Sequence, residues 1–168
     1  MYYMRKISRG KWPEESRIAQ ATLEDIQADT VTSELKTDHN TLSLWEANNP
    51  EEIDEVFVAL ASNLDSIGTM CIVKIDEERL RGFTIDNQLG DTPAIDINAK
   101  HHNVTGLNYV NMGRVIQEII GSLADNGLER RTKGQMRKLL VDAYKKGKLD
   151  MDKMSEKLRD EIYKQSAC

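Results

Sequence analysis

The chain of 168 residues is long enough to form one domain with a hydrophobic core. Its composition, 39% hydrophobic and 30% charged, is typical of a globular protein, and no apolar run approaches the roughly 18 residues that span a bilayer. The N-terminus lacks the apolar segment of a secretory signal, so we expect a cytoplasmic protein without membrane contacts. Two cysteines, Cys71 and Cys168, cannot make a disulfide framework, and we expect both to be reduced thiols.

The net charge of −5 is unevenly distributed along the chain. Residues 14–99 carry nineteen acidic and five basic side chains, a net charge of −14, whereas residues 129–148 carry eight basic and two acidic side chains, a net charge of +6. Such segregation informs on solubility and partners rather than on fold. We therefore describe the chain as an acidic body with a basic segment.

In chain order, residues 3–7 predict a short strand, and residues 14–40 keep no single hydrophobic period, which favours short helices and loops. The clearest pattern begins at Leu42 with an alternating strand and continues into a helix that Asn49 caps and Pro50 opens. A mostly apolar strand over residues 70–75 follows and is typical of a central strand covered on both faces. Strand, helix and strand together predict a β-α-β crossover.

Beyond residue 76 we expect a turn of helix, a short strand near residues 83–85 and a polar loop. Apolar spacing then predicts a helix over residues 108–124, and two more helices follow it. The sequence therefore predicts an α+β fold, or an α/β fold, in which a small mixed sheet precedes a largely helical C-terminal third. We expect a body of residues 1–127 and a helical hairpin of residues 128–168 that packs on it as one domain.

Catalytic residues, if there are any, are expected in the loop region of residues 86–103, because loops on a rigid scaffold often carry function. Four titratable side chains gather there: Asp91, Asp96, His101 and His102. Adjacent histidines point in different directions in any regular element, so at most one of them readily joins a metal or acid–base site. The sequence contains none of the common phosphate-binding, hydrolase or paired-cysteine motifs, and we expect no cofactor and no metal.

The basic segment, residues 130–148, predicts a helix, and a short turn joins this helix to the last helix of the chain. Two helices joined by a short turn occur in many nucleic-acid-binding proteins. Its candidate binding residues are Arg130, Arg131, Lys133 and Arg137. Cations at a helix C-terminus are also expected from the helix dipole alone, and the following helix is rich in acids. Docking on the acidic body is therefore a competing interpretation.

Trp12 is the remaining candidate, because an exposed tryptophan often anchors a partner, although a place in the core is the better interpretation. No motif identifies a family. The sequence favours a non-enzymatic, protein-binding protein of bacterial type that neutralises a basic target, as an immunity protein or antitoxin neutralises a toxin. Catalysis on the loop of residues 86–103 and nucleic-acid binding through residues 130–148 are the alternatives, and the oligomeric state is open.

Overall fold

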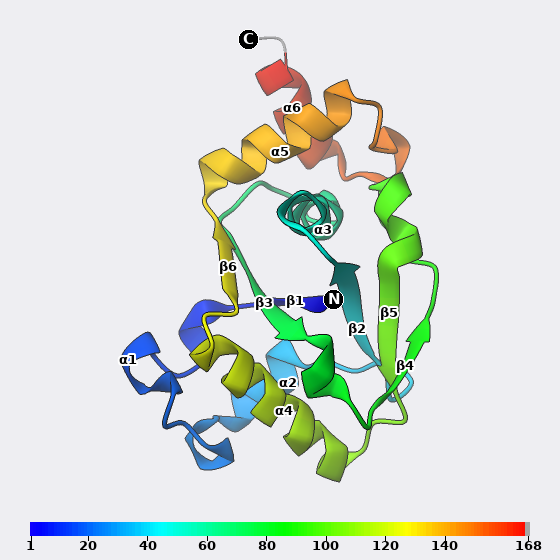
Figure 1. Ribbon diagram of the computed structural model, residues 1–168. Coiled ribbons are helices and arrows are strands. Elements are labelled where there is room, and N and C mark those ends of the chain that lie inside the picture. The colour runs from blue at the N-terminus through cyan, green and yellow to red at the C-terminus, as the bar shows by residue number, and fades with distance from the viewer. Residues whose placement is uncertain (167–168) are drawn as a thin grey trace.

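The computed structural model describes residues 1–166 and contains one six-stranded antiparallel sheet with the strand order β4-β5-β2-β1-β3-β6 (Figure 1). The strands are β1 (Tyr2–Ile7), β2 (Leu42–Ala47), β3 (Met70–Asp76), β4 (Thr84–Asn87), β5 (His101–Thr105) and β6 (Leu128–Arg131). The fold is thus α+β with a helical C-terminal part, as the sequence predicts.

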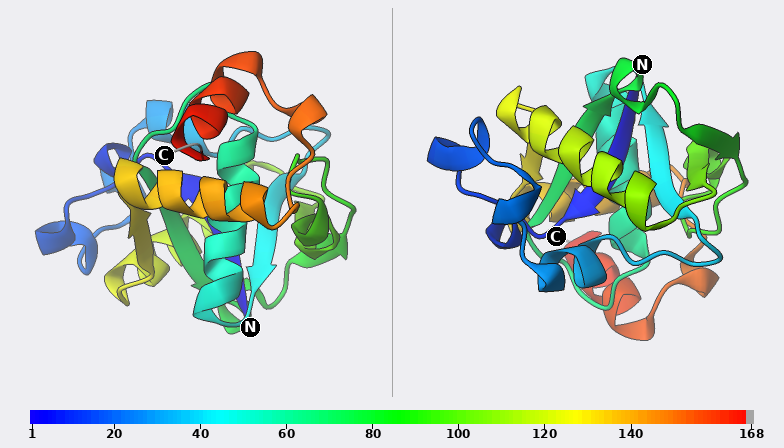
Figure 2. Two further views of the ribbon diagram at one scale, coloured as in Figure 1. Left: turned by 90° about the horizontal axis from the view of Figure 1, so that it is seen from above. Right: turned by 90° about the horizontal axis from the view of Figure 1, so that it is seen from below.

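Helices lie on both faces of the sheet, so the molecule has three layers (Figure 2). One face is covered by α3 (Pro50–Ser62), α5 (Lys133–Lys145) and α6 (Glu156–Ser166). The other is covered by α1 (Glu15–Ile18), α2 (Ala28–Glu34) and α4 (Tyr109–Ala124). Short 3₁₀ turns join these elements: η1 (Arg9–Lys11), η2 (Leu23–Asp25), η3 (Glu77–Leu80), η4 (Ile95–Lys100) and η5 (Met151–Lys153).

The N-terminal strand β1 occupies the centre of the sheet. It pairs antiparallel with β2 on one side and with β3 on the other, so β2 and β3 run in the same direction. The β2-α3-β3 unit is therefore a crossover, as predicted, with β1 inserted between its two strands. Successive side chains of β1 enter opposite cores: Met4, fully buried, contacts the α3 side, and Tyr3 the α4 side.

The two predicted long helices begin where their caps place them. The Asn49 side chain accepts a hydrogen bond from the Glu52 N–H at 2.9 Å, and Pro50 is the first residue of α3. Asn108 and Asn111 form a reciprocal capping box at the start of α4. These caps fix the helix ends from local sequence alone.

The structure differs from the sequence prediction in three elements. Strands β5 and β6 were not expected, because their polar and charged residues lack a strand-like apolar alternation. Asp150 has the residue type of a cap for the last predicted helix, but it caps the short turn η5, and the last helix begins at Glu156. The predicted division at residue 127 falls at the start of β6, which is itself a strand of the sheet.

The C-terminal helices share a core with α3. Leu140 of α5 and Leu158 and Ile162 of α6 are fully buried in the same cluster as Phe57. Cys71 is a partly buried free thiol on β3, and Cys168 lies outside the described residues. Among residues 1–166, no helix combines the length and apolar composition needed to cross a membrane.

We expect Leu158→Ala to lower the free energy of unfolding by about 2–5 kcal/mol, because it removes a buried side chain whose surroundings cannot collapse fully. Leu89, 79% exposed, supplies the control: Leu89→Ala changes stability by less than about 0.5 kcal/mol. Urea unfolding followed by circular dichroism measures both, and a single shifted transition is expected. A separate early transition in Leu158→Ala would show that α5 and α6 unfold independently of the sheet.

Candidate functional site

The two adjacent histidines lie on strand β5, not in a loop, and their side chains enter opposite faces of the sheet. The His101 ring packs edge-on against Trp45, with ring centroids 4.9 Å apart. The His102 ring packs edge-on against Tyr3 on the other face, at 5.4 Å. At most one of them can therefore belong to any one site, as the sequence indicates.

His102 contacts a carboxylate that lies far away in sequence. Its Nε2 is 3.1 Å from Oε2 of Glu46 on the neighbouring strand β2. The other oxygen of Glu46, Oε1, accepts a hydrogen bond from the Asn48 side chain at 3.0 Å. Since a carboxylate only accepts hydrogen bonds, the shorter contact to Glu46 favours a proton on Nε2 of His102, whereas the Asn87 Nδ2, 3.4 Å from the same nitrogen, would favour the other tautomer. The pair is thus oriented like the carboxylate–imidazole pairs that serve in acid–base catalysis.

Tyr3 completes this cluster. Burial raises the pKa of the Tyr3 phenol above its usual value, and the nearby Glu77 and Glu46 carboxylates raise it further. The Tyr3 phenol is therefore neutral at physiological pH. The His102 side chain is only 12% exposed, which leaves a substrate little access to the imidazole. Sequence reasoning missed Tyr3 and Glu46 because only the strand order brings them to His102.

His101 has a different environment. Its Nδ1 lies 3.0 Å from the backbone carbonyl oxygen of Gln88, which can only accept, so Nδ1 carries the proton. Burial lowers the pKa of His101; the hydrogen bond to Gln88 opposes this effect, and the charge of His102 adds to it. His101 therefore helps to fix the 88–92 segment, and within residues 1–166 it has no carboxylate partner.

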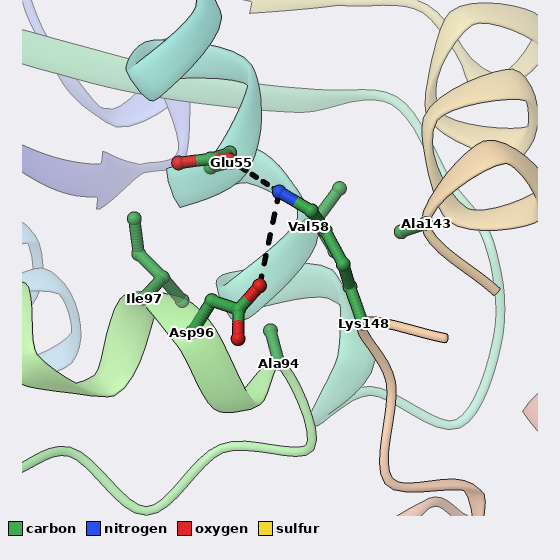
Figure 3. A pocket seen from close by; sticks show the side chains of 7 residues that line it. All are labelled: Glu55, Val58, Ala94, Asp96, Ile97, Ala143 and Lys148. Carbon is green, nitrogen blue, oxygen red and sulfur yellow. Dashed lines mark hydrogen bonds and ion pairs between the residues drawn. The ribbon is translucent and has the colours of Figure 1, made fainter. Parts of the chain in front are cut away.

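The two predicted aspartates do not meet the histidines. Asp91 forms an ion pair with Lys153 at 2.6 Å, and Asp96 lies 3.8 Å from Lys148. Figure 3 shows the carboxylate of Asp96 directed at Lys148, which also reaches Glu55 at 2.9 Å. Within residues 1–166 there is no group of three metal-ligating side chains that could hold an ion.

A small cavity lies beside this ion-pair cluster (Figure 3). Its volume is ≈ 40 Å³ and its walls are mostly apolar, including Val58, Ile97 and Ala143. A space of this size holds about one water molecule and is too small for a substrate. Lys148 and its two carboxylates therefore join η4 to α3 and to the end of α5, a structural role.

The segment between β4 and β5 is held rigidly by its own hydrogen bonds. The buried Asn98 side chain accepts from the Thr92 N–H at 3.1 Å and hydroxyl at 2.8 Å, and donates to the Thr92 carbonyl at 3.0 Å. Gly90 packs closely here, since an added Cβ would lie 2.8 Å from the Trp45 ring. This segment is a supporting element and does not gather the four predicted catalytic residues.

The basic segment is partly neutralised within the molecule. Arg131 donates to Asp54 of α3 at 2.8 Å and to Glu129 at 3.2 Å, and its guanidinium lies 4.8 Å from the ring centroid of Phe57. These contacts fix Arg131 between β6 and α3. It is therefore unavailable to a phosphate unless they break.

Of the other three predicted basic residues, one lies near an acid and two form no ion pair in the described part of the chain. Arg137 lies 3.8 Å from Glu161 of α6. Arg130 and Lys133 are exposed and form no ion pair with residues 1–166. The four residues thus do not present a single free basic face. Arg131 and Arg137 instead contact acids of α3 and α6. These contacts correspond to the competing interpretation, in which the basic segment docks on acidic parts of the same chain.

Trp12 is a core residue. Its side chain is 4% exposed and belongs to the cluster between the sheet and α4. This burial agrees with the core position that the sequence favours for Trp12, and it leaves no exposed indole for the alternative role of a surface anchor.

One exposed charged feature remains, which we call the acidic arm, residues 14–29. It projects from the body beside α4 (Figures 1 and 2). Five exposed acids lie on it, none in an ion pair with residues 1–166: Glu14, Glu15, Glu24, Asp25 and Asp29. An open hollow of ≈ 620 Å³ lies in the same arm, between residues 10–17 and residues 20–27. The acidic arm is therefore both charged and concave.

Comparison with known proteins supplies no relative: no family model, no curated protein and no solved structure matches the chain.

We expect the neutral histidines to adopt opposite tautomers, with the proton on Nδ1 in His101 and on Nε2 in His102, because their acceptors are Gln88 and Glu46. A ¹⁵N NMR titration identifies the tautomers and also measures the pKa values. The pKa of His101 should lie below the value of about 6.5 for a free imidazole. Its contribution to stability is then fully present above pH 6.5 and is lost as the pH falls through its folded-state pKa. An Nε2-protonated His101 would contradict the geometry.

Proposed function

We propose that the protein acts by binding a partner protein with a basic surface, and that the acidic arm is its contact surface. The observation that supports this proposal is the concentration, on one short projecting segment, residues 14–29, of exposed acids that form no ion pair within the described chain. Much of the body's acidity is matched internally, as in Glu52–Lys100, Asp54–Arg131 and Glu55–Lys148. The five acids of the arm face solvent and form no ion pair with residues 1–166, although Asp25 accepts hydrogen bonds from Thr22.

Unpaired acids on a projecting surface affect the rate of association with a partner more than the stability of the fold. Exposed charges contribute little to the stability of their own chain, about 0–1 kcal/mol for a pair. The same charges steer an oppositely charged partner during diffusion and align it on contact. The protein keeps a net charge of −5 despite its basic segment, so the long-range field also favours a cationic partner.

The shape of the arm suits such a contact. Ile18 is buried against α4, which holds the arm to the body, and Arg17 is the only base among residues 14–29. The hollow of ≈ 620 Å³ has room for a lysine or arginine side chain of a partner, and it is lined by Glu14 and Asp25 together with Lys11 and Arg17. This arrangement supports a neutralising role of the kind that immunity proteins and antitoxins play toward basic toxins.

The test uses a neutralised arm, Glu14→Gln with Glu15→Gln and Glu24→Gln, which removes three negative charges and leaves the helix-capping Asp25 intact. We expect this variant to capture at least about tenfold less partner protein from nuclease-treated native extract than the wild type, because a close charge pair at an interface is worth 1 kcal/mol or more. Quantitative mass spectrometry of the captured fraction measures the effect.

A matched variant changes the same number of exposed acids elsewhere: Asp65→Asn, Asp86→Asn and Asp160→Asn. It should capture the partner as the wild type does. Equal loss in both variants would overturn the role of the arm. Capture of nucleic acid in a parallel experiment with untreated extract, lost on Arg130→Gln with Lys133→Gln, would instead favour the basic segment. Loss of cellular function in His102→Gln but not in the arm variant would favour catalysis at the Glu46–His102 pair.

A further inference from the structure

The central sheet opens between β1 and β2. Their pairing extends only from Tyr2 opposite Ala47 to Met4 opposite Trp45, although each strand continues to pair with its other neighbour. A pocket of ≈ 330 Å³ lies beyond the last pair. It is lined by Arg5, Lys6, Ser8, Ser33, Glu34, Ser43, Trp45 and Leu60.

Arg5 spans this opening. Its Nη1 donates to the Ser43 carbonyl of β2 at 2.8 Å, and its Nη2 donates to the Glu34 carbonyl at the end of α2 at 2.6 Å. The Nε of Arg5 is buried and has no hydrogen-bond partner among the described residues. Burial lowers the pKa of Arg5 to about 10, against the attraction of Glu34. The guanidinium therefore carries a positive charge that its surroundings compensate incompletely.

Positive charge exceeds negative charge around the pocket, although the protein as a whole is acidic. Lys6 is exposed at the wall and forms no ion pair within residues 1–166. The single carboxylate, Glu34, is already engaged by the Ser8 N–H at 2.5 Å and by Lys11 at 3.5 Å. The lining thus contains two bases, Arg5 and Lys6, and one carboxylate, Glu34, and this balance favours an anion.

The rest of the lining has two characters. Trp45 and Leu60 supply an apolar wall on the α3 side of the sheet. Ser8 and Ser33 supply polar groups at the rim, where Lys11 donates to the Ser33 hydroxyl at 2.6 Å. Small-molecule sites commonly combine an apolar wall with a few convergent polar groups in a concavity of this order of size.

We propose that this pocket binds a small organic carboxylate, whose anionic group lies beside Arg5 and Lys6 and whose apolar body packs against Trp45 and Leu60. A guanidinium recognises a carboxylate by its positive charge and by charge-assisted hydrogen bonds, and the ammonium of Lys6 supplies a second cation at the same wall. The inference is independent of partner binding by the acidic arm, because none of the arm's acids lines this pocket.

Fluorescence tests the proposal at the pocket itself. Trp12 and Trp45 are the only tryptophans, so Trp12→Phe leaves Trp45, which lines the pocket, as the single reporter. Titration with sodium benzoate should change the Trp45 emission saturably, with a Kd below about 1 mM. Benzamide, which has the same shape and no charge, should bind at least about tenfold more weakly, since a charge-assisted hydrogen bond is roughly twice as strong as a neutral one.

Two lysine variants in the Trp12→Phe background locate the anion. Lys6→Gln should weaken benzoate binding by about threefold or more, and Lys36→Gln, an exposed lysine outside the lining, should leave it unchanged. Both substitutions are at the surface, so circular dichroism should show an intact fold. Absence of saturable binding up to 10 mM (about ten times the expected Kd), equal binding of benzamide, or an unchanged affinity in Lys6→Gln would each overturn the proposal.

Discussion

The structure depends on the insertion of β1 between β2 and β3. This strand is the first in the sequence, yet it lies at the centre of the sheet and pairs with residues about 40 and 70 positions away. Because both partners are antiparallel to β1, the crossover through α3 can place its helix over one face while α4 covers the other. The two hydrophobic cores meet only across this sheet, and Met4 and Tyr3 anchor β1 in one core each.

A second set of interactions decides which charges remain available. The basic segment folds back on the acidic body, where Arg131 contacts Asp54, Lys148 contacts Glu55 and Arg137 approaches Glu161. Individually such pairs are worth little, but together they fix α5 and α6 over α3 and remove much of the positive field of the segment. The acidic arm takes no part in this compensation. An uneven charge distribution in the sequence thus becomes an unpaired acidic surface in the fold.

The elements that local chemistry defines were predictable. Asn49 and Asn108 mark the starts of α3 and α4, and the apolar run of β3 indicates a strand covered on both faces. Strands β5 and β6 were not, because His101 and Arg130 stand in polar stretches that become strands only through pairing with a neighbour. Tertiary contacts override weak local preference in both strands, the inner strand β5 and the edge strand β6.

The candidate site shows the same limit. That adjacent histidines diverge is a property of any strand, so the sequence indicates it correctly. That His102 meets Glu46 and Tyr3 requires the strand order, which no local pattern contains. The burial of Trp12 likewise depends on the path of residues 14–29 around α4, where the sequence keeps no clear period.

The central claim is that unpaired acids on the arm drive association with a basic partner. Stopped-flow measurement of the association rate constant with the captured partner, across a series of salt concentrations, tests it most directly. The account predicts that the rate constant falls steeply as the ionic strength rises, because salt screens charges beyond about 8–10 Å at physiological concentrations. A rate constant that does not change with salt would contradict electrostatic steering and the assignment of the acidic arm as the contact surface.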